Sequence, residues 1–203
     1  METDWTKTIR KLFEAAAPYL AARGDEEHTR VAHQMALYLL EKEGGDRRVV
    51  EPAVILHDVG WSTLKPEQIR SAFGVRASGE EARRLKRLHE TNGAVLARGI
   101  LETLGYDPGL TDRIAAIIET HDTGRTAESL EEKLVKDADK LWRYSRIGFW
   151  KEQERQGVTA EELYRHRVKG LGEWFFTPSA AALAAEELKA RAQEIAARAA
   201  QET

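Results

Sequence analysis

The stretch "VILHDVGWS", residues 54–62, decides how the rest of the chain is interpreted. Its first three residues are apolar and indicate that the backbone is entering the protein interior, and His57 and Asp58 follow them directly. A carboxylate buried beside an imidazole costs free energy unless another group compensates for it. A bound metal ion would provide that compensation, and so would a salt bridge between the two side chains. The residues outside this stretch have to distinguish these alternatives.

Helical periodicity continues on both sides of this stretch and covers almost the whole chain. No segment alternates in the manner of a strand, and the sequence has no long internal repeat. Residues 61–80 mix Gly, Pro and Ser and are predicted to form an irregular insert. The sequence therefore predicts an all-α bundle, with helices over 4–22, 26–43, 47–58 and 80–104, then from Thr111, from Ser129 into the 150s, and after caps at Thr159 and Ser179.

The composition limits the kinds of partner and cofactor. The 203 residues carry 31 Lys and Arg against 34 Asp and Glu, which gives a net charge of −3. Binders of nucleic-acid polymers or anionic membranes depend on excess positive charge, so neither partner is expected. The N-terminal residues contain no long apolar run, so we expect neither a signal peptide nor a membrane span. The expected location is cytoplasmic. Because the chain has no cysteine, a metal would need imidazole and carboxylate ligands.

Four of the six histidines are spaced one per predicted helix, each beside apolar residues. A single buried histidine is usually satisfied by hydrogen bonds, and that explanation suffices for any one of them. Four on successive helices, followed by acidic residues on a later helix, are harder to explain as separate accidents. Helical bundles build metal sites from such inward-facing side chains. The candidate ligands are His28, His57, Asp58, His89 and His121, with Asp137 or Asp139 as the last.

Asp137 and Asp139, in the stretch "KLVKDADKLW", compete for the last ligand position. Residues two apart on a helix point about 200° away from each other, so only one of the two can face the site. The flanking apolar residues put the buried face on the side of Asp139 as easily as on the other side. Asp139 is the better candidate, but periodicity alone does not decide.

Four stretches together resemble successive motifs of the HD superfamily of metal-dependent phosphohydrolases. They are "EEHTRVAHQMA", "AVILHDVGW", "RLHETNGAVLA" and "IIETHDTGRTAESLEEKLVKDADKLW", and they extend from residue 26 to about residue 145. The H…HD…D signature of that superfamily maps onto His28, His57, Asp58 and Asp139. The resemblance therefore favours Asp139 over Asp137. His89 and His121 match two extra histidines of those branches that hold two metals.

This resemblance implies an HD-domain helical bundle, as a single domain with a C-terminal helical extension. We expect residues 1–25 to form an N-terminal helix that packs on the core. Residues 26–150 would form the HD domain with the metal site, and residues 151–203 would complete the bundle or form an interface. The stretch after His121 is similar to bacterial diadenosine-tetraphosphate hydrolases, whereas the tail is similar to small bacterial HD nucleotide hydrolases. The choice of substrate between these branches stays open.

The resemblance also implies an arrangement of metals. One ion would bind His28, His57, Asp58 and Asp139, and a second would bind His89 and His121 and share Asp58 as a bridge. The expected cofactor is one or two divalent ions of Fe, Mn, Co, Ni or Zn, with Mg as a further option. Such ions activate water and neutralise the charge of a phosphoryl group.

The expected function is therefore hydrolysis of a phosphate ester or phosphoanhydride, with a nucleotide as the expected small-molecule substrate. Asp58 and Lys140 are the predicted catalytic residues. Lys140, Arg125 and Trp61 are the predicted substrate contacts, Lys140 because it follows the last ligand and Arg125 because it lies just past His121. Trp61 begins the insert, which could form a lid.

Several other residues have two explanations. The basic run "RRLKRLH" before His89 could contact a polyphosphate, but neighbouring glutamates make a salt-bridged helix face at least as good an explanation. Asp122 could support a ligand histidine or end a helix. His33 faces away from His28, and His166 is expected at the surface. Three tryptophans are more typical of a core or an interface than of base stacking: Trp142, Trp150 and Trp174.

Two other classes of function remain. Some HD proteins with six such ligands hold mixed-valent diiron and oxidise small alcohols or phosphonates, and ligand identity alone does not separate them from hydrolases. The second alternative is a non-catalytic signalling module, although such modules typically lose some of the ligands that are present here. The Ala-rich helix over 179–201 could pack on the body of the protein or on a second copy, so a homodimer also stays open.

Overall fold

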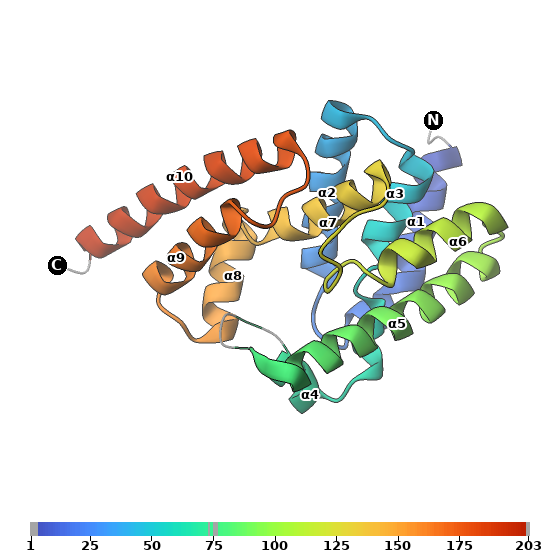
Figure 1. The fold of residues 1–203 in the computed structure, drawn as a ribbon, viewed down its shortest axis with the longest axis horizontal. Helices are drawn as coiled ribbons and strands as arrows, with labels where there is room; N and C mark the ends of the chain where they lie inside the picture. Colours follow the sequence, from blue (N-terminus) through green and yellow to red (C-terminus); the bar gives the residue numbers. More distant parts are fainter. Residues whose placement is uncertain (1–3, 73, 75–76, 202–203) are drawn as a thin grey trace.

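The structure is a computed structural model that describes residues 4–72, 74 and 77–201. The other residues belong to the two ends of the chain and to the predicted insert, and expectations that fall on them lie outside the described part. The described residues form α-helices, one 3₁₀ helix and no strand, as predicted for an all-α protein (Figure 1). The elements are α1 (Asp4–Leu20), α2 (Glu26–Glu43), α3 (Arg47–Leu56), η1 (Val59–Thr63), α4 (Pro66–Ala72), α5 (Gly79–Thr103), α6 (Pro108–Ile118), α7 (Leu130–Trp142), α8 (Arg146–Gln156), α9 (Ala160–Leu171) and α10 (Pro178–Gln201).

Helix α3 is the centre of the bundle. The Asp46 side chain caps it by accepting a hydrogen bond from the backbone N–H of Arg48. Every residue from Val49 to Leu56 is buried, and α1, α2, α6 and α7 all pack against this helix. Apart from Glu51 this stretch is apolar on every side, and such a helix must be enclosed by its neighbours. Its C-terminal end, which carries His57, is therefore delivered into the interior.

Both ends of the chain share one hydrophobic core with the central helices. Leu12 and Ala16 of α1 belong to this core, and so do Ala184 and Leu188 of α10. In Figure 1, α8, α9 and α10 lie together on one side, and α5 and α6 lie on the other. Among the described residues, no helix combines the length and the apolar character needed to cross a membrane.

The insert predicted to be irregular contains two short helices, η1 and α4. Gly60 in η1 lies directly on the backbone of α5, because a Cβ atom at this position would come within 2.0 Å of the His89 carbonyl oxygen. Only glycine permits this approach. The contact holds the residues after His57 and Asp58 against the turn of α5 that carries His89.

Three predicted helix boundaries were wrong. Helix α6 begins after Asp107, not at Thr111, because the Asp107 side chain accepts from the backbone N–H of Leu110. The helix from Ser129 ends at Trp142, and a new helix starts after Ser145. The break allows α8 to turn sharply, with Gly148 so close to Trp142 that a Cβ atom would come within 1.9 Å of its carbonyl oxygen. Likewise, the hydroxyl of Thr177, not that of Ser179, accepts from the backbone N–H of Ala180 at the start of α10.

Candidate metal centre

Six predicted ligands from different elements converge inside the bundle. They are contributed by α2, the end of α3, the residue before η1, α5, the turn after α6, and α7. Each is at most 4% exposed: His28, His57, Asp58, His89, His121 and Asp139. Charged and polar side chains buried at this density need a common partner or strong mutual pairing.

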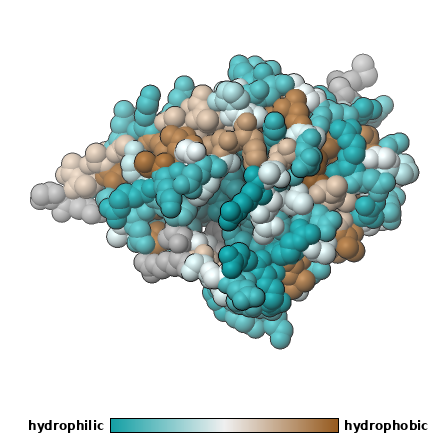
Figure 2. Space-filling view, viewed as in Figure 1, coloured by the Kyte–Doolittle hydropathy of each residue, from teal (hydrophilic) through white to brown (hydrophobic). Residues whose placement is uncertain are grey.

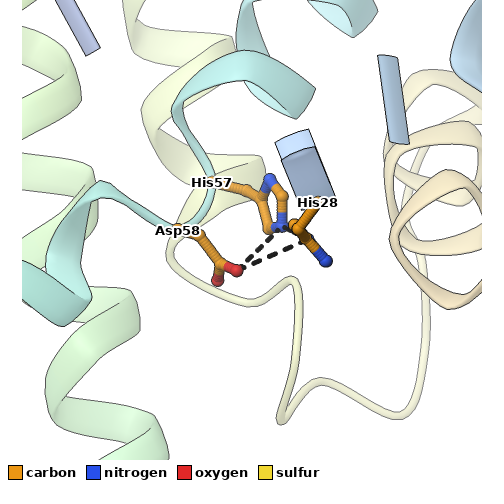
Figure 3. A group of neighbouring side chains, drawn as sticks. All are labelled: His28, His57 and Asp58. Atoms are coloured by element: carbon orange, nitrogen blue, oxygen red, sulfur yellow. Dashed lines mark hydrogen bonds and ion pairs between the residues drawn. The ribbon is translucent and has the colours of Figure 1, made fainter. Parts of the chain in front are cut away.

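The carboxylate of Asp58 lies between two pairs of histidines. Its Oδ2 atom is 3.4 Å from Nε2 of both His28 and His57. Figure 3 shows these two imidazoles turned toward the carboxylate. Its Oδ1 atom is 3.7 Å from Nε2 of both His89 and His121. One carboxylate thus offers one oxygen to each of two groups that could hold a metal ion.

Asp139 lies beside the first group. Its Oδ1 atom lies 3.3 Å from Nε2 of His28 and 3.5 Å from Nε2 of His57, and these two nitrogens are 2.9 Å apart. In the second group, the Nε2 atoms of His89 and His121 are 3.3 Å apart. Nitrogen and oxygen atoms that converge in this way on one small space are the arrangement expected of ligands around an ion.

The orientation of two histidines supports a ligand role. Nδ1 of His57 lies 2.7 Å from the carbonyl oxygen of Val54, and Nδ1 of His121 lies 2.7 Å from that of Ile118. A carbonyl oxygen can only accept, so Nδ1 carries the proton in both rings. In the neutral ring this leaves the Nε2 lone pair directed into the site, as in metal-ligating histidines. The residues present therefore fit a divalent metal ion.

Charge compensation within the site is strong. Burial alone would lower the pKa of His57, but the carboxylates of Asp58 and Asp139 outweigh it and raise this pKa to about 10. Burial would raise the pKa of Asp58, yet His57 and the Arg23 guanidinium hold it well below its ordinary value. The pKa of His89 is instead lowered to about 3, first by burial and then by the charge of His121. His57 and His89 therefore differ in proton affinity, because two carboxylates face His57 whereas burial dominates at His89.

Arg23 was not singled out in the sequence. Its Nη2 atom lies 2.7 Å from Oδ2 of Asp58, and its guanidinium stacks over Trp61, 4.8 Å from the ring centroid. It also pairs with Asp25. Asp58 is therefore both a candidate ligand and the partner of Arg23 in a salt bridge. The only sequence signal was a basic residue in the turn before His28.

A cavity of about 670 Å³ opens from the centre, and both Asp58 and Asp139 line it. In the view of Figure 2, hydrophilic residues surround a hollow near the middle of the face that is shown. Basic side chains dominate its polar wall: Arg23, Lys86, Arg125, Lys136, Lys140, Arg143 and Arg167. Such a concentration of cations beside a metal site suits a ligand that carries negative charge.

The three predicted substrate contacts all line this cavity. The Nζ atom of Lys140 lies 2.8 Å from Oδ2 of Asp139 and 3.4 Å from Oδ1 of Asp122, so it also holds the ligand carboxylate in place. Arg125 is exposed at the wall. Trp61 is only 3% exposed, donates from Nε1 to Oδ1 of Asp58 over 2.9 Å, and stacks flat on His89. Direct contact of these residues with a substrate stays a prediction.

Asp137 and Asp139 point to different parts of the molecule. Asp139 faces His28 and His57, whereas Asp137 accepts hydrogen bonds from the backbone N–H groups of Phe176 and Thr177, each over 2.9 Å. Burial raises the pKa of Asp137, against the effect of these hydrogen bonds. Asp137 therefore fastens the C-terminal segment to the helix that carries a candidate ligand.

The basic run before His89 divides between the two explanations. Arg84 pairs with Glu81, and Arg87 pairs with Glu119, so both belong to a salt-bridged surface. Lys86 instead lines the cavity and lies 3.5 Å from Asp122.

Comparison with known proteins identifies the family. The model of the HD domain matches residues 26–144, more than half of the chain. The chain belongs to the HD domain family. Among solved structures, this HD protein resembles a protein from an uncultured Thermotogales bacterium that is described as a predicted HD superfamily hydrolase. The two share 21% sequence identity with a TM-score of 0.64, and the match covers 96% of this chain and 92% of that one. This likeness shows a shared fold, and no curated protein is significantly similar in sequence.

Proposed function

We propose that this HD protein is a metal-dependent phosphohydrolase that acts on a phosphate ester or phosphoanhydride, with nucleotides as the substrate class. The observation that carries the proposal is the position of Asp58, whose two oxygens face two different pairs of histidines. Family membership supports it, as does the basic cavity beside the centre. Phosphoryl transfer needs mainly positioning and neutralisation of charge, and this site is built to supply both.

The roles of the residues follow from their contacts. His28, His57, Asp58 and Asp139 would hold one ion, and His89 and His121 with Asp58 would hold a second. Bound ions of this kind supply an activated water and polarise the phosphoryl oxygens.

The Nζ atom of Lys140 donates to Oδ2 of Asp139 and lines the cavity, where it adds a positive charge. Arg125 adds a positive charge at the exposed wall, where a phosphate group could pair with it.

The test combines metal analysis with turnover on the same purified sample. We expect about two metals per chain, because Asp58 belongs to two groups that could each hold an ion. We also expect release of phosphate from members of a panel of nucleotides and phosphate esters. Asp58→Ala should remove both the metals and the turnover while circular dichroism retains the helical signal. The matched control is Asp112→Ala, because Asp112 is an exposed aspartate that pairs with Arg98 far from the centre.

The outcomes separate the alternatives. Turnover that survives in Asp58→Ala contradicts the assignment of the site. Two irons with oxygen uptake on small alcohols or phosphonates, and without phosphate release, would replace the hydrolase by a diiron oxygenase. Phosphate release with about one metal per chain would retain the hydrolase but make His89 and His121 substrate-side residues.

A further inference from the structure

We propose that Trp174, in the segment after α9, recognises the substrate's nucleobase by stacking on it. Phe176 of the same segment and His166 of α9 line the same cavity and would contribute to this recognition. This inference rests on the proposed function, since it assigns the group attached to the phosphate. These residues lie beyond residues 26–144, which match the family model. Specificity for the organic part of the substrate would then be supplied by the C-terminal extension of the chain.

The indole of Trp174 is seated firmly against α9. A Cβ atom at Gly170 would lie 2.6–2.7 Å from the ring atoms, so only glycine allows the indole to lie on the helix at this point. The guanidinium of Arg167 lies 5.6 Å from the ring centroid, and the ring of Tyr144 meets the indole edge-on at 6.2 Å. Arg167 and Gly170 are three residues apart and share one face of α9. The side of the indole toward α9 is therefore covered.

The remaining surface of the indole lines the cavity. Trp174 is partly exposed, and Phe176 and His166 line the same cavity as Asp58. Trp174 also packs against the hydrophobic core, so only the part of its ring that lines the cavity is available to a ligand. A fixed aromatic ring with such an accessible surface can serve as a stacking platform for the flat face that every nucleobase has. Arg23 and Lys140, which contact the candidate ligands Asp58 and Asp139, are the basic residues placed to pair with phosphate. Arg167 and Lys136 lie against the rings of Trp174 and Phe176 instead, and these rings would take the base.

His166 adds a polar group beside this platform. Its ring lies 5.3 Å from that of Trp174, and its Nδ1 atom is 2.9 Å from Nη1 of Arg167. Because a guanidinium can only donate, Nδ1 accepts, and the proton of the neutral ring is on Nε2. Burial, reinforced by Arg167, lowers the pKa of His166 and keeps the ring neutral near pH 7. His166 thus offers a hydrogen-bond donor, which matches the ring nitrogens and carbonyl oxygens of a base.

The platform is fastened to the metal centre through α7. Asp137 binds the backbone of Phe176 and Thr177, and Asp139, two residues later, faces the histidines. One short helix therefore holds both the backbone beside Phe176 and the candidate ligand Asp139. A ligand with a phosphate at one end and a flat ring at the other would meet both without rearrangement of the backbone.

The experiment compares adenosine 5′-monophosphate with ribose 5-phosphate, which lacks only the base. Binding and hydrolysis of both are measured on the Mn²⁺-loaded full chain. In the wild type we expect the adenine compound to be preferred on the order of ten-fold or more, as for base stacking on an aromatic side chain. In Trp174→Leu this preference ratio should fall toward one, and Trp174→Phe should retain most of it. Trp150→Leu is the matched control. Trp150 lies on α8 in a separate small hydrophobic cluster, and its Nε1 atom donates a hydrogen bond to Glu194 of α10.

Either of two results overturns the inference: a wild-type protein without preference for the adenine compound, or a ratio in Trp174→Leu within two-fold of the wild type. If the leucine variant does not fold, the indole N–H resonance of Trp174 in the wild type, assigned with Trp174→Phe, serves instead. It should shift with adenosine 5′-monophosphate and not with ribose 5-phosphate, and equal shifts contradict the proposal. Base-dependent binding without any hydrolysis would refute the proposed function while supporting this platform.

Discussion

Glu90 provides a test of how the second histidine group is positioned. This glutamate on α5 is fully buried, and its Oε1 atom accepts hydrogen bonds from the backbone N–H groups of Asp122 and Thr123, each over 2.8 Å. Its Oε2 atom accepts from the Thr123 hydroxyl. The turn that carries His121 is therefore fastened to α5 at the residue next to His89. We predict that Glu90→Ala releases this turn.

The size of the effect follows from the number of bonds lost. Glu90→Ala leaves two backbone donors and one hydroxyl without their acceptor, and each unpaired buried donor costs about 1–3 kcal/mol. Thr123 is exposed, so water can replace part of the loss. The expected decrease in the free energy of unfolding is about 2–4 kcal/mol. Glu90→Gln can keep the acceptor of the two backbone N–H groups. It replaces Oε2 by an NH2 group that cannot accept from the Thr123 hydroxyl and removes the charge that faces Arg87, so about 1 kcal/mol is expected.

The assay combines urea unfolding with metal content. If Glu90 positions His121, the alanine variant should retain the ion held by His28 and His57 but bind the second ion more weakly. Glu81→Gln on the same helix is the control, because Glu81 is exposed and pairs with the exposed Arg84. The stability and metal content of this variant should equal those of the wild type. Unchanged stability in Glu90→Ala, or parallel loss of both ions, would refute this reasoning.

Three further predictions concern packing, pH and metal removal. Gly60→Ala should cost on the order of 3 kcal/mol or prevent folding, because its Cβ would lie 2.0 Å from the His89 carbonyl oxygen; wild-type urea unfolding would contradict this. Glu51 is buried, and although burial opposes the shift, hydrogen bonds led by that from His33 lower its pKa below the ordinary 4.5. Its stabilisation is therefore present above pH 4.5 and is lost as the pH falls toward the lowered value. The difference in unfolding free energy between the wild type and Glu51→Gln should shrink below that pH, and a constant difference would exclude the effect. Finally, removal of metal with a chelator should lower the melting temperature, and re-addition should restore it. The free energy of unfolding should fall by about 2.7 kcal/mol if the ion was present at 100 times its dissociation constant. A melting temperature insensitive to both steps would argue against a bound ion.

Much of the fold followed from local patterns. Apolar periodicity and capping residues predicted the helices, since both depend on neighbours within a turn or two of the chain. Two boundary errors concern local caps, at Asp107 and Thr177. The other errors fell where one backbone packs against another. Helix α7 ends at Trp142 because α8 folds back on it at Gly148, and the insert after Asp58 is helical where it packs on α5. Periodicity contains no information about such approaches between backbones.

The candidate ligands could be named from their spacing and the family motifs, because each lies at a recognisable position within a short stretch of sequence. The choice between Asp137 and Asp139 was different. The pattern around them left the buried face ambiguous, and the structure shows both aspartates buried on different sides of α7, with different partners.

The sequence by itself determined the helical class, the family and the set of residues able to hold a metal ion, since these depend on residue type and on spacing along the chain. Only the tertiary structure decided that Arg23 reaches Asp58, that Glu90 holds the turn of His121, and that Trp174, which packs against the core, also lines the cavity. The physical reason is the same in each case. A contact between residues tens of positions apart depends on how helices pack and cross, and that geometry is set by the whole core at once.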